Sequence, residues 1–218
     1  MALFVRKPET HTDIPIYNLS HERTVLVVGL GNMGKEYDGT RHNIGFACVD
    51  HFAQKNEFPA WIEKKDLRCH FTSKNLGGTR VIIIKPTTLM NASGEAAFST
   101  QQFYKIHTHD MLVVHDELDI PFGQIRVRIG GGSAGNNGVK SLQQHIDGEI
   151  PRIRVGIANE FSGRADSADF VLGKFTGEEQ SHIKSLASEV ESMITEFIFG
   201  GELAHDTRSF HDQTESGQ

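Results

Sequence analysis

The sequence lacks the features that mark membrane-spanning, secreted and disulfide-stabilised proteins. Within its 218 residues no apolar run approaches the roughly 20 residues needed to cross a bilayer, and residues 1–7 hold neither a long apolar region nor a small-residue cleavage site. Three acidic residues before position 23 argue against an organelle transit peptide. The two cysteines, Cys48 and Cys69, fall in an expected helix and an expected strand, which is typical of buried thiols in a reducing compartment. These absences predict a cytoplasmic protein that makes no membrane contact.

The chain also has no excess of positive charge. Lys and Arg number 22 against 28 Asp and Glu, and the resulting net charge of -6 does not indicate a general nucleic-acid-binding protein. A local basic patch is still compatible with this total. Hydrophobic residues make up 38% and charged residues 23% of the chain, so its composition and length predict one globular domain. We expect an N-terminal extension at 1–23, a domain at 24–200 and a polar, frayed tail at 201–218.

The hydrophobic pattern predicts strands that alternate with helices. Thr176 and Glu179 have the spacing of a capping box that starts the last helix, and the glycine pair at 200–201 ends it. Asn91 or Ser93 is the expected N-cap of the second helix. The class is therefore α/β, a single domain with a twisted, mixed, mostly parallel central sheet flanked by helices. We expect strands at 25–28, 67–73, 80–85, 111–114, 125–129 and 152–158, helices at 44–54, 93–106, 139–146 and 177–199, and a polar loop at 159–169.

The most informative stretch is V-L-V-V-G-L-G-N-M-G-K-E-Y-D-G-T-R-H-N-I-G-F-A-C-V-D, residues 25–50. Its glycines at 29, 31 and 34 fit the G-x-G-x-x-G pattern of dinucleotide-binding proteins. That fold requires a helix from the second glycine and an acidic residue about 20 positions later, at the end of a second strand. Here residues 35–43 are polar and turn-like, and the acid in range, Asp50, falls inside a helical segment. The sequence therefore argues against a nucleotide-dependent oxidoreductase.

Polar side chains follow several of the predicted strands. Asn32 and His42 come after the first strand, Asn91 after the strand at 80–85, Asp116 after the strand at 111–114, and Asn137 in a glycine-rich loop. If the strands are parallel neighbours, these side chains converge at one edge of the sheet. A histidine held by a carboxylate can take a proton from water, and asparagines can orient that water or bind an oxyanion. With no serine or cysteine placed as a nucleophile, the pattern favours a hydrolase that activates water.

Each of these residues also has a simpler interpretation. The chain has 12 histidines, so His42 alone is more often a surface or helix-capping residue. Asp116 could begin the turn that follows it, and Asn91 could be only a helix cap. Asn137 could be only a left-handed turn residue before a glycine.

A metal site is a weaker interpretation of the region around 116. An extended segment alternates its side chains between two faces, so the candidate ligands would be split. No H-x-x-x-H pair accompanies them. We therefore expect no metal. The candidate ligands are His115, Asp116, Glu117 and Asp119.

Three motifs in order resemble the bacterial peptidyl-tRNA hydrolase family. They are G-L-G-N-M-G-K-E-Y-D-G-T-R-H-N-I-G, then K-P-T-T-L-M-N-A-S-G, then H-D-E-L-D-I-P-F-G with a basic strand and G-G-G-S-A-G-N-N-G-V-K-S behind it. F-V-L-G-K-F before the last helix also fits, so the resemblance covers residues 24–198. It implies an enzyme that cleaves the ester between a peptide and the 3′ end of tRNA, recycles prematurely released peptidyl-tRNA, and needs no metal or cofactor.

The resemblance also implies roles for individual residues. His42 would be the general base and Asp116 the partner that orients it. Asn32 and Asn91 would bind the last residue of the peptide and the catalytic water, while Asn137 would hold that water or the tRNA terminus. Tyr37 and Met90 would shape the pocket. Arg126 and Arg128, which share one strand face, would contact tRNA phosphates together with Lys140.

Two residues depart from the family pattern. Met33 stands where proline is usual, so the loop before the site loses a fixed φ angle. Asn136 stands where histidine is common, which removes a titratable group from the edge of the site. Plant chloroplast splicing factors resemble the same family and bind RNA or a protein partner. A non-catalytic protein that binds RNA or a protein partner is therefore the alternative to an enzyme. The family resemblance and the absence of an obvious exposed apolar helix predict a monomer.

Overall fold

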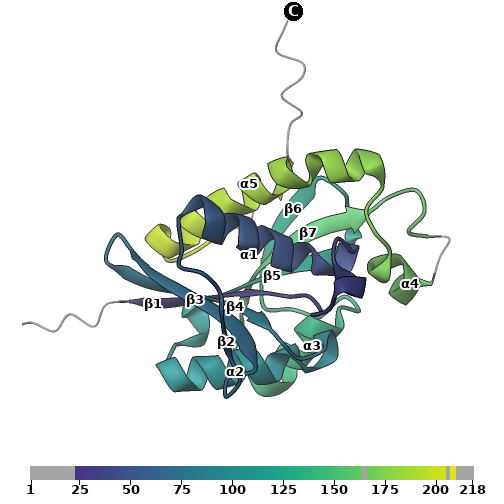
Figure 1. Cartoon of the computed structure of the whole chain (residues 1–218). Helices are drawn as coiled ribbons and strands as arrows, with labels where there is room; N and C mark the ends of the chain where they lie inside the picture. Colours follow the sequence, from purple (N-terminus) through teal and green to yellow (C-terminus); the bar gives the residue numbers. More distant parts are fainter. Residues whose placement is uncertain (1–22, 164–165, 205–206, 210–218) are drawn as a thin grey trace, which may run out of the picture.

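The computed structural model describes residues 23–163, 166–204 and 207–209, and the expected extension at 1–23 lies outside them apart from Arg23. In the described residues eight strands form one sheet, ordered β2-β3-β4-β1-β5-β7-β6-β8 (Figure 1). The central four strands, β4, β1, β5 and β7, are parallel, and antiparallel strands extend the sheet on both sides. The predicted α/β class and mixed sheet are confirmed. The strands are β1 (Thr24–Gly29), β2 (Ile62–Lys64), β3 (Cys69–Leu76), β4 (Thr79–Pro86), β5 (Met111–Pro121), β6 (Gln124–Ile129), β7 (Pro151–Ala158) and β8 (Thr207–Ser209).

Helices cover both faces of the sheet, with α1 and α5 on one side and α2 and α3 on the other (Figure 1). In β1, Val25 and Val27 join the core under α1 and α5, whereas Leu26 and Val28 join the core under α2 and α3. Successive side chains of a strand point to opposite faces, so a strand that is apolar at every position must be covered on both. The helices are α1 (Ile44–Lys55), α2 (Ser93–Tyr104), α3 (Asn137–His145) and α5 (Gly177–Gly200).

Two short helices place polar residues where β1 ends. These are the 3-10 helices η1 (Lys35–Tyr37) and η2 (Arg41–Asn43), and η2 packs beside α4 (Ser167–Leu172), at the right of Figure 1. Thr40 forms an isolated β-bridge with Lys174, which ties the two segments together. The edge of an open α/β sheet at the carboxyl ends of its parallel strands is where ligand sites form.

Three expectations about the elements are wrong. β5 continues to Pro121 and does not end near Val114, because its main chain keeps pairing with β7 through His115, Asp116 and Glu117. The expected polar loop at 159–169 contains the start of α4, which Asp166 caps by accepting a hydrogen bond from the Ala168 N–H. In the expected frayed tail, β8 pairs with β6, and Leu203 is buried in the core.

Of the predicted helix ends, those of the last helix are confirmed and the N-cap of the second helix is wrong. The capping box of Thr176 and Glu179 is confirmed, as is the stop at Gly201, whose φ of 81° is left-handed. Neither Asn91 nor Ser93 caps the second helix, since α2 begins at Ser93 after the 3-10 helix η3 (Met90–Ala92) without a side-chain cap. Within the described part of the chain, no helix is long and apolar enough to span a membrane.

Candidate active site

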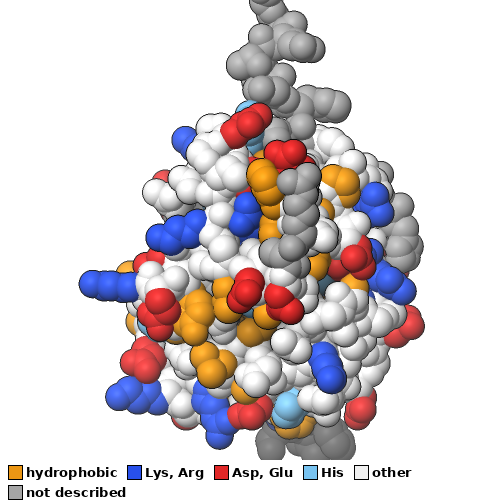
Figure 2. Space-filling model, turned by 90° about the vertical axis from the view of Figure 1, so that its right-hand side faces the viewer, with side chains coloured by type: hydrophobic (Ala, Val, Ile, Leu, Met, Phe, Trp, Pro, Cys, Tyr) orange, Lys and Arg blue, Asp and Glu red, His pale blue; other side chains and the backbone are white. Residues whose placement is uncertain are grey.

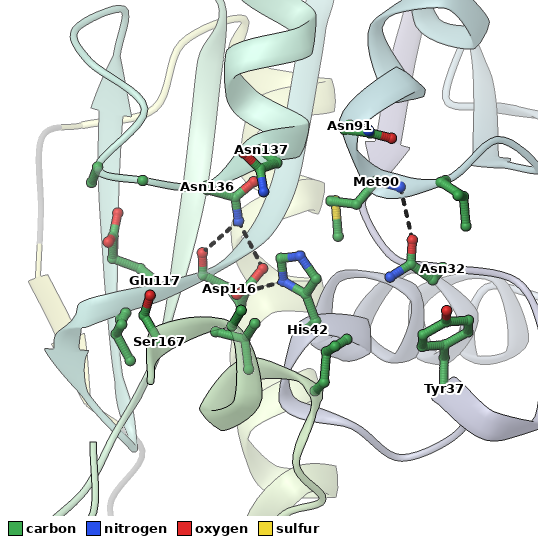
Figure 3. Close-up of a pocket in the computed structure, with 17 residues that line it drawn as sticks. Asn32, Tyr37, His42, Met90, Asn91, Asp116, Glu117, Asn136, Asn137 and Ser167 are labelled. Atoms are coloured by element: carbon green, nitrogen blue, oxygen red, sulfur yellow. Dashed lines mark hydrogen bonds and ion pairs between the residues drawn. The ribbon is translucent and has the colours of Figure 1, made fainter. Parts of the chain in front are cut away.

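The polar residues expected at the sheet edge surround one pocket of about 450 Å³ (Figure 3). It lies between η1, η2, η3, the carboxyl half of β5, the start of α3, and α4. Parallel pairing of β1 with β4 and β5 brings these segments together. Its lining includes Asn32, Tyr37, His42, Leu89, Met90, Asn91, Asp116, Glu117, Leu118, Asn136, Asn137, Val171 and Leu172.

His42 and Asp116 form a buried pair at the base of this pocket. Nδ1 of His42 lies 2.9 Å from Oδ2 of Asp116, and the two residues are 7% and 3% exposed. A carboxylate accepts the Nδ1 proton and thereby leaves Nε2 as the nitrogen with a lone pair. Figure 3 shows Nε2 on the side of the ring away from Asp116, toward the open pocket. The geometry is that of a general base held in one tautomer.

Asn32 is oriented by main-chain hydrogen bonds. Its Oδ1 accepts from the Met90 N–H at 2.7 Å, so its NH2 group must face the pocket. The side chain of Asn43 holds the Asn32 main chain at both ends, with Oδ1 accepting from its N–H at 2.8 Å and Nδ2 donating to its carbonyl at 2.9 Å. A donor aimed at the cavity is suited to bind a carbonyl oxygen or an oxyanion.

The other predicted pocket residues differ in their exposure. Tyr37 is half-buried and Met90 is buried, whereas Asn91 and Asn137 are exposed. Asn137 is the first residue of α3 and not part of the loop, and its φ is not positive, so the left-handed turn interpretation is wrong. Asn91 does not cap α2, which leaves its amide available to the pocket.

Arg41 anchors the segment that carries His42. Its guanidinium donates to Glu179 at 2.8 Å and to the Lys174 carbonyl at 2.7 Å, and it lies 4.4 Å from the centre of the Phe170 ring. Glu179 also accepts from Asn159 and from the main chain of the α5 cap. The segment that carries His42 is thus joined to α4 and α5 through the buried Arg41–Glu179 ion pair.

A cysteine nucleophile is excluded at this pocket, since neither Cys48 nor Cys69 lines it. Both thiols are buried, and burial raises the pKa of Cys48 to about 12 and that of Cys69 to about 11. A thiol with so high a pKa is not a thiolate at neutral pH. Ser167 of α4 also lines the pocket, and among the described residues no side-chain hydrogen bond joins it to His42.

The family model described as peptidyl-tRNA hydrolase matches residues 26–217. The chain belongs to the peptidyl-tRNA hydrolase family. A peptidyl-tRNA hydrolase of Levilactobacillus brevis is 38% identical over 178 residues, which are 81% of this chain and 94% of the relative. One of Clostridium botulinum is 41% identical over 174 residues, 78% of this chain and 88% of the relative. The crystal structure of the Acinetobacter baumannii peptidyl-tRNA hydrolase matches with a TM-score of 0.75 at 35% identity, over 82% of this chain and 90% of that chain.

Asn136 belongs to the pocket of this peptidyl-tRNA hydrolase family member, although the residue pattern did not assign it a role there. It caps α3 and bonds to Asp116. The signal that could have found it is an N-cap asparagine directly before the helical segment, but we expected the helix to start only at Val139. The apolar residues of α4 that line the pocket were missed because no helix was expected at 167–172.

Behind Asp116, His115 and Arg152 form a buried pair that shapes the glycine-rich loop. His115 Nδ1 donates to the Asp116 carbonyl at 2.7 Å, and its Nε2 lies 3.5 Å from Arg152. Arg152 in turn donates to the carbonyls of residues 130–132. Burial lowers the pKa of His115 to about 4 and that of Arg152 to about 10. With both ring nitrogens engaged, His115 is a structural residue and not a metal ligand.

We expect acid to destabilise the fold through His115. Its folded-state pKa of about 4 is below the ordinary 6.5, so the unfolded chain binds a proton first and stability is lost as pH falls from 6.5 to 4. This loss should be about 3 kcal/mol larger in the wild type than in His115→Gln. Urea unfolding followed by circular dichroism across this pH range measures it. The exposed His109→Gln is the control and should follow the wild type; equal pH slopes in wild type and His115→Gln would contradict the account.

A basic surface begins at the pocket wall. Arg126 and Arg128 share one face of β6, as predicted, and they pair across the sheet with Arg154 and Arg152 of β7. Arg154 bonds at 2.9 Å to Glu117, a pocket residue, which connects this surface to the site. Arg128 is exposed and Arg126 is half-buried, while the buried Arg152 donates hydrogen bonds to the glycine-rich loop. Lys140 is exposed on α3. The arginines of β7 were missed because their alternation was interpreted only as a strand.

Proposed function

We propose that this chain hydrolyses the ester bond between a peptide and the 3′ end of tRNA, and so recycles peptidyl-tRNA during translation. The observation that carries this proposal is the His42–Asp116 pair, which faces an open pocket with an asparagine donor opposite. Membership of the peptidyl-tRNA hydrolase family supports it. No group on the chain needs to be acylated in this reaction.

The reaction proceeds by direct attack of water on the ester carbonyl. Nε2 of His42 takes a proton from the water as its oxygen bonds to the carbonyl carbon, and Asp116 stabilises the imidazolium that forms. The NH2 group of Asn32 binds the oxyanion, and Asn91 helps to orient the water. The carbon–oxygen bond to the ribose then breaks, and His42 returns its proton to the departing 3′ oxygen. The products are a peptide with a free carboxylic acid, which releases its proton to solvent, and a tRNA with a free 3′ hydroxyl.

Apolar side chains at the rim accept the peptide. Leu89 is 60% exposed and Leu172 is 44% exposed, and both line the pocket. Figure 2 views the molecule from this side: hydrophobic side chains gather in the middle of the face beside acidic ones, and Lys and Arg stand mostly toward its margins, interspersed with Asp and Glu. Met90 and Tyr37 shape the inner wall, and Asn137 holds the water or the terminal nucleotide. The exposed apolar side chains at the centre of the face thus suit a peptide.

Arg126, Arg128 and Lys140 bind phosphates of the tRNA. Contacts of this kind hold a substrate without reading its sequence, as an enzyme that acts on many tRNAs requires. We also propose that the protein acts as a monomer in the cytoplasm. Its catalytic domain spans 24–200, between the extension at 1–23 and the tail at 201–218. Light scattering of the purified full chain, with and without tRNA, tests the monomer.

Removal of both arginines of β6 should weaken tRNA binding and its dependence on salt. In Arg126→Gln/Arg128→Gln the slope of log affinity against log salt should become shallower by about 1 to 2, because fewer counterions are released. Filter binding of deacylated tRNA at several salt concentrations measures the slope. Arg80→Gln is the matched control, since Arg80 is exposed at the start of β4, the opposite end of the parallel strands, and should leave the slope unchanged. A double variant with the wild-type slope would exclude these arginines as the phosphate contacts.

The assay that tests the function compares N-acetyl-aminoacyl-tRNA with free aminoacyl-tRNA. We expect the chain to release the N-acetyl-amino acid and to leave the free aminoacyl ester intact over the same period. Tight tRNA binding without cleavage of the blocked ester would favour the alternative, a non-catalytic RNA-binding homologue.

A further inference from the structure

Asn136 connects the catalytic carboxylate to the start of α3 (Figure 3). Its Nδ2 donates to Oδ1 of Asp116 at 2.8 Å and lies 3.3 Å from the Asp116 carbonyl. Its Oδ1 accepts from the main-chain N–H groups of Gly138 at 3.0 Å and Val139 at 3.1 Å. The residue is 8% exposed, so these bonds are largely shielded from water.

The helix cap determines which way this amide faces. A side-chain amide offers an acceptor on one side and donors on the other. Reversal would place the NH2 group of Asn136 against two N–H donors and its oxygen against the Asp116 carboxylate, and both contacts are repulsive. As long as α3 is capped, the NH2 group must point at Asp116.

Asp116 is consequently held at both of its oxygens. Asn136 donates to Oδ1, and His42 Nδ1 lies 2.9 Å from Oδ2. Two donors on opposite oxygens set the plane of the carboxylate, and that plane sets the direction of the imidazole. A carboxylate bonded only to His42 could rotate with the ring and turn Nε2 away from the water.

We propose that Asn136 is a positioning residue of the hydrolytic reaction, which holds Asp116 and through it His42 in the orientation that accepts a proton from water. This inference rests on the proposed function. An amide does not titrate, so the bond from Asn136 to Asp116 does not depend on pH. A histidine at this position would change its charge as the pH changes. The titratable and charged groups around Asp116 are His42 on η2, His115 and Glu117 on β5, and Arg152 and Arg154 on β7.

The decisive variant is Asn136→Asp, assayed by cleavage of N-acetyl-aminoacyl-tRNA at pH 8. Aspartate keeps the capping oxygen and nearly the same shape, but it presents no NH2 group to Asp116 and adds a second carboxylate beside it. We expect kcat to fall by about 10- to 100-fold while KM changes by less than about threefold. Asn136→Ser retains a capping oxygen without the second charge and should lose kcat in the same way, so it keeps the test open if the aspartate variant does not fold.

A conservative variant separates positioning from folding. Asn136→His restores an N–H donor toward Asp116, so it should recover most of kcat and add an ionisation to the pH dependence of kcat. If Asn136 were only a helix cap, the Asp and Ser variants would retain wild-type kcat, and that result would overturn the proposal. A histidine variant no faster than the serine variant would also count against the donor bond. A wild type that cleaves no blocked ester would instead overturn the proposed function, together with this inference.

Discussion

His42→Ala is expected to abolish nearly all cleavage of N-acetyl-aminoacyl-tRNA. In the proposed reaction His42 is the general base, and positioned general bases contribute about 10²- to 10⁴-fold to rates. Single-turnover release of the N-acetyl-amino acid measures the loss. Affinity for deacylated tRNA should stay at the wild-type value, because His42 is 7% exposed and the proposed phosphate contacts are made by Arg126, Arg128 and Lys140.

His109→Ala is the matched control for this change. His109 has a side chain 77% exposed, outside the pocket, and its removal should leave the rate unchanged. Cleavage that survives in His42→Ala would mean that another group activates the water. A parallel loss of tRNA affinity would mean that His42 binds the substrate and does not carry the chemistry.

Asp116→Asn is expected to lower kcat by about 10²- to 10⁴-fold with little change in KM. An asparagine amide turned toward His42 would donate to Nδ1 and so place the imidazole proton on Nε2, where it blocks proton transfer from water. An amide turned the other way would direct its NH2 group at the NH2 group of Asn136, which is unfavourable. Steady-state kinetics on the blocked substrate give both constants.

Asp119→Asn makes the same chemical change three residues along β5, at an exposed position, and should retain wild-type kcat. Nuclear magnetic resonance of the His42 ring nitrogens reports the tautomer directly. A ring that keeps its proton on Nδ1 in Asp116→Asn, together with full activity, would contradict the role assigned to Asp116.

The convergence of the site was predictable because it depends on regular strands. Val25 to Val28 and the apolar run before His115 are recognisable from composition alone, and parallel neighbours bring their carboxyl ends to one edge. His42, Asp116 and Asn32 therefore surround one pocket as the sequence suggested. The capping box at Thr176 was equally local, since its two partners are three residues apart.

The remainder depended on tertiary contacts that no local pattern reports. Polar residues at 115–117 indicated the end of a strand, yet β5 continues through them because β7 pairs beside it and Arg152 and Arg154 partner His115 and Glu117. The cap of α3 was missed because Asn136 has a turn-like sequence around it, and its second partner, Asp116, lies 20 residues away. A long-range bond of this kind has no signature in the neighbouring residues.

The most direct test of the account is the fate of solvent oxygen in a single turnover. With N-acetyl-aminoacyl-tRNA in ¹⁸O-labelled water, attack of a His42-activated water predicts one ¹⁸O atom in the carboxylate of the released N-acetyl-amino acid. It predicts none in the 3′ hydroxyl of the tRNA and no acylated protein by mass spectrometry. Label in the tRNA 3′ oxygen, or an acyl group trapped on the chain, would contradict direct hydrolysis by the His42–Asp116 pair.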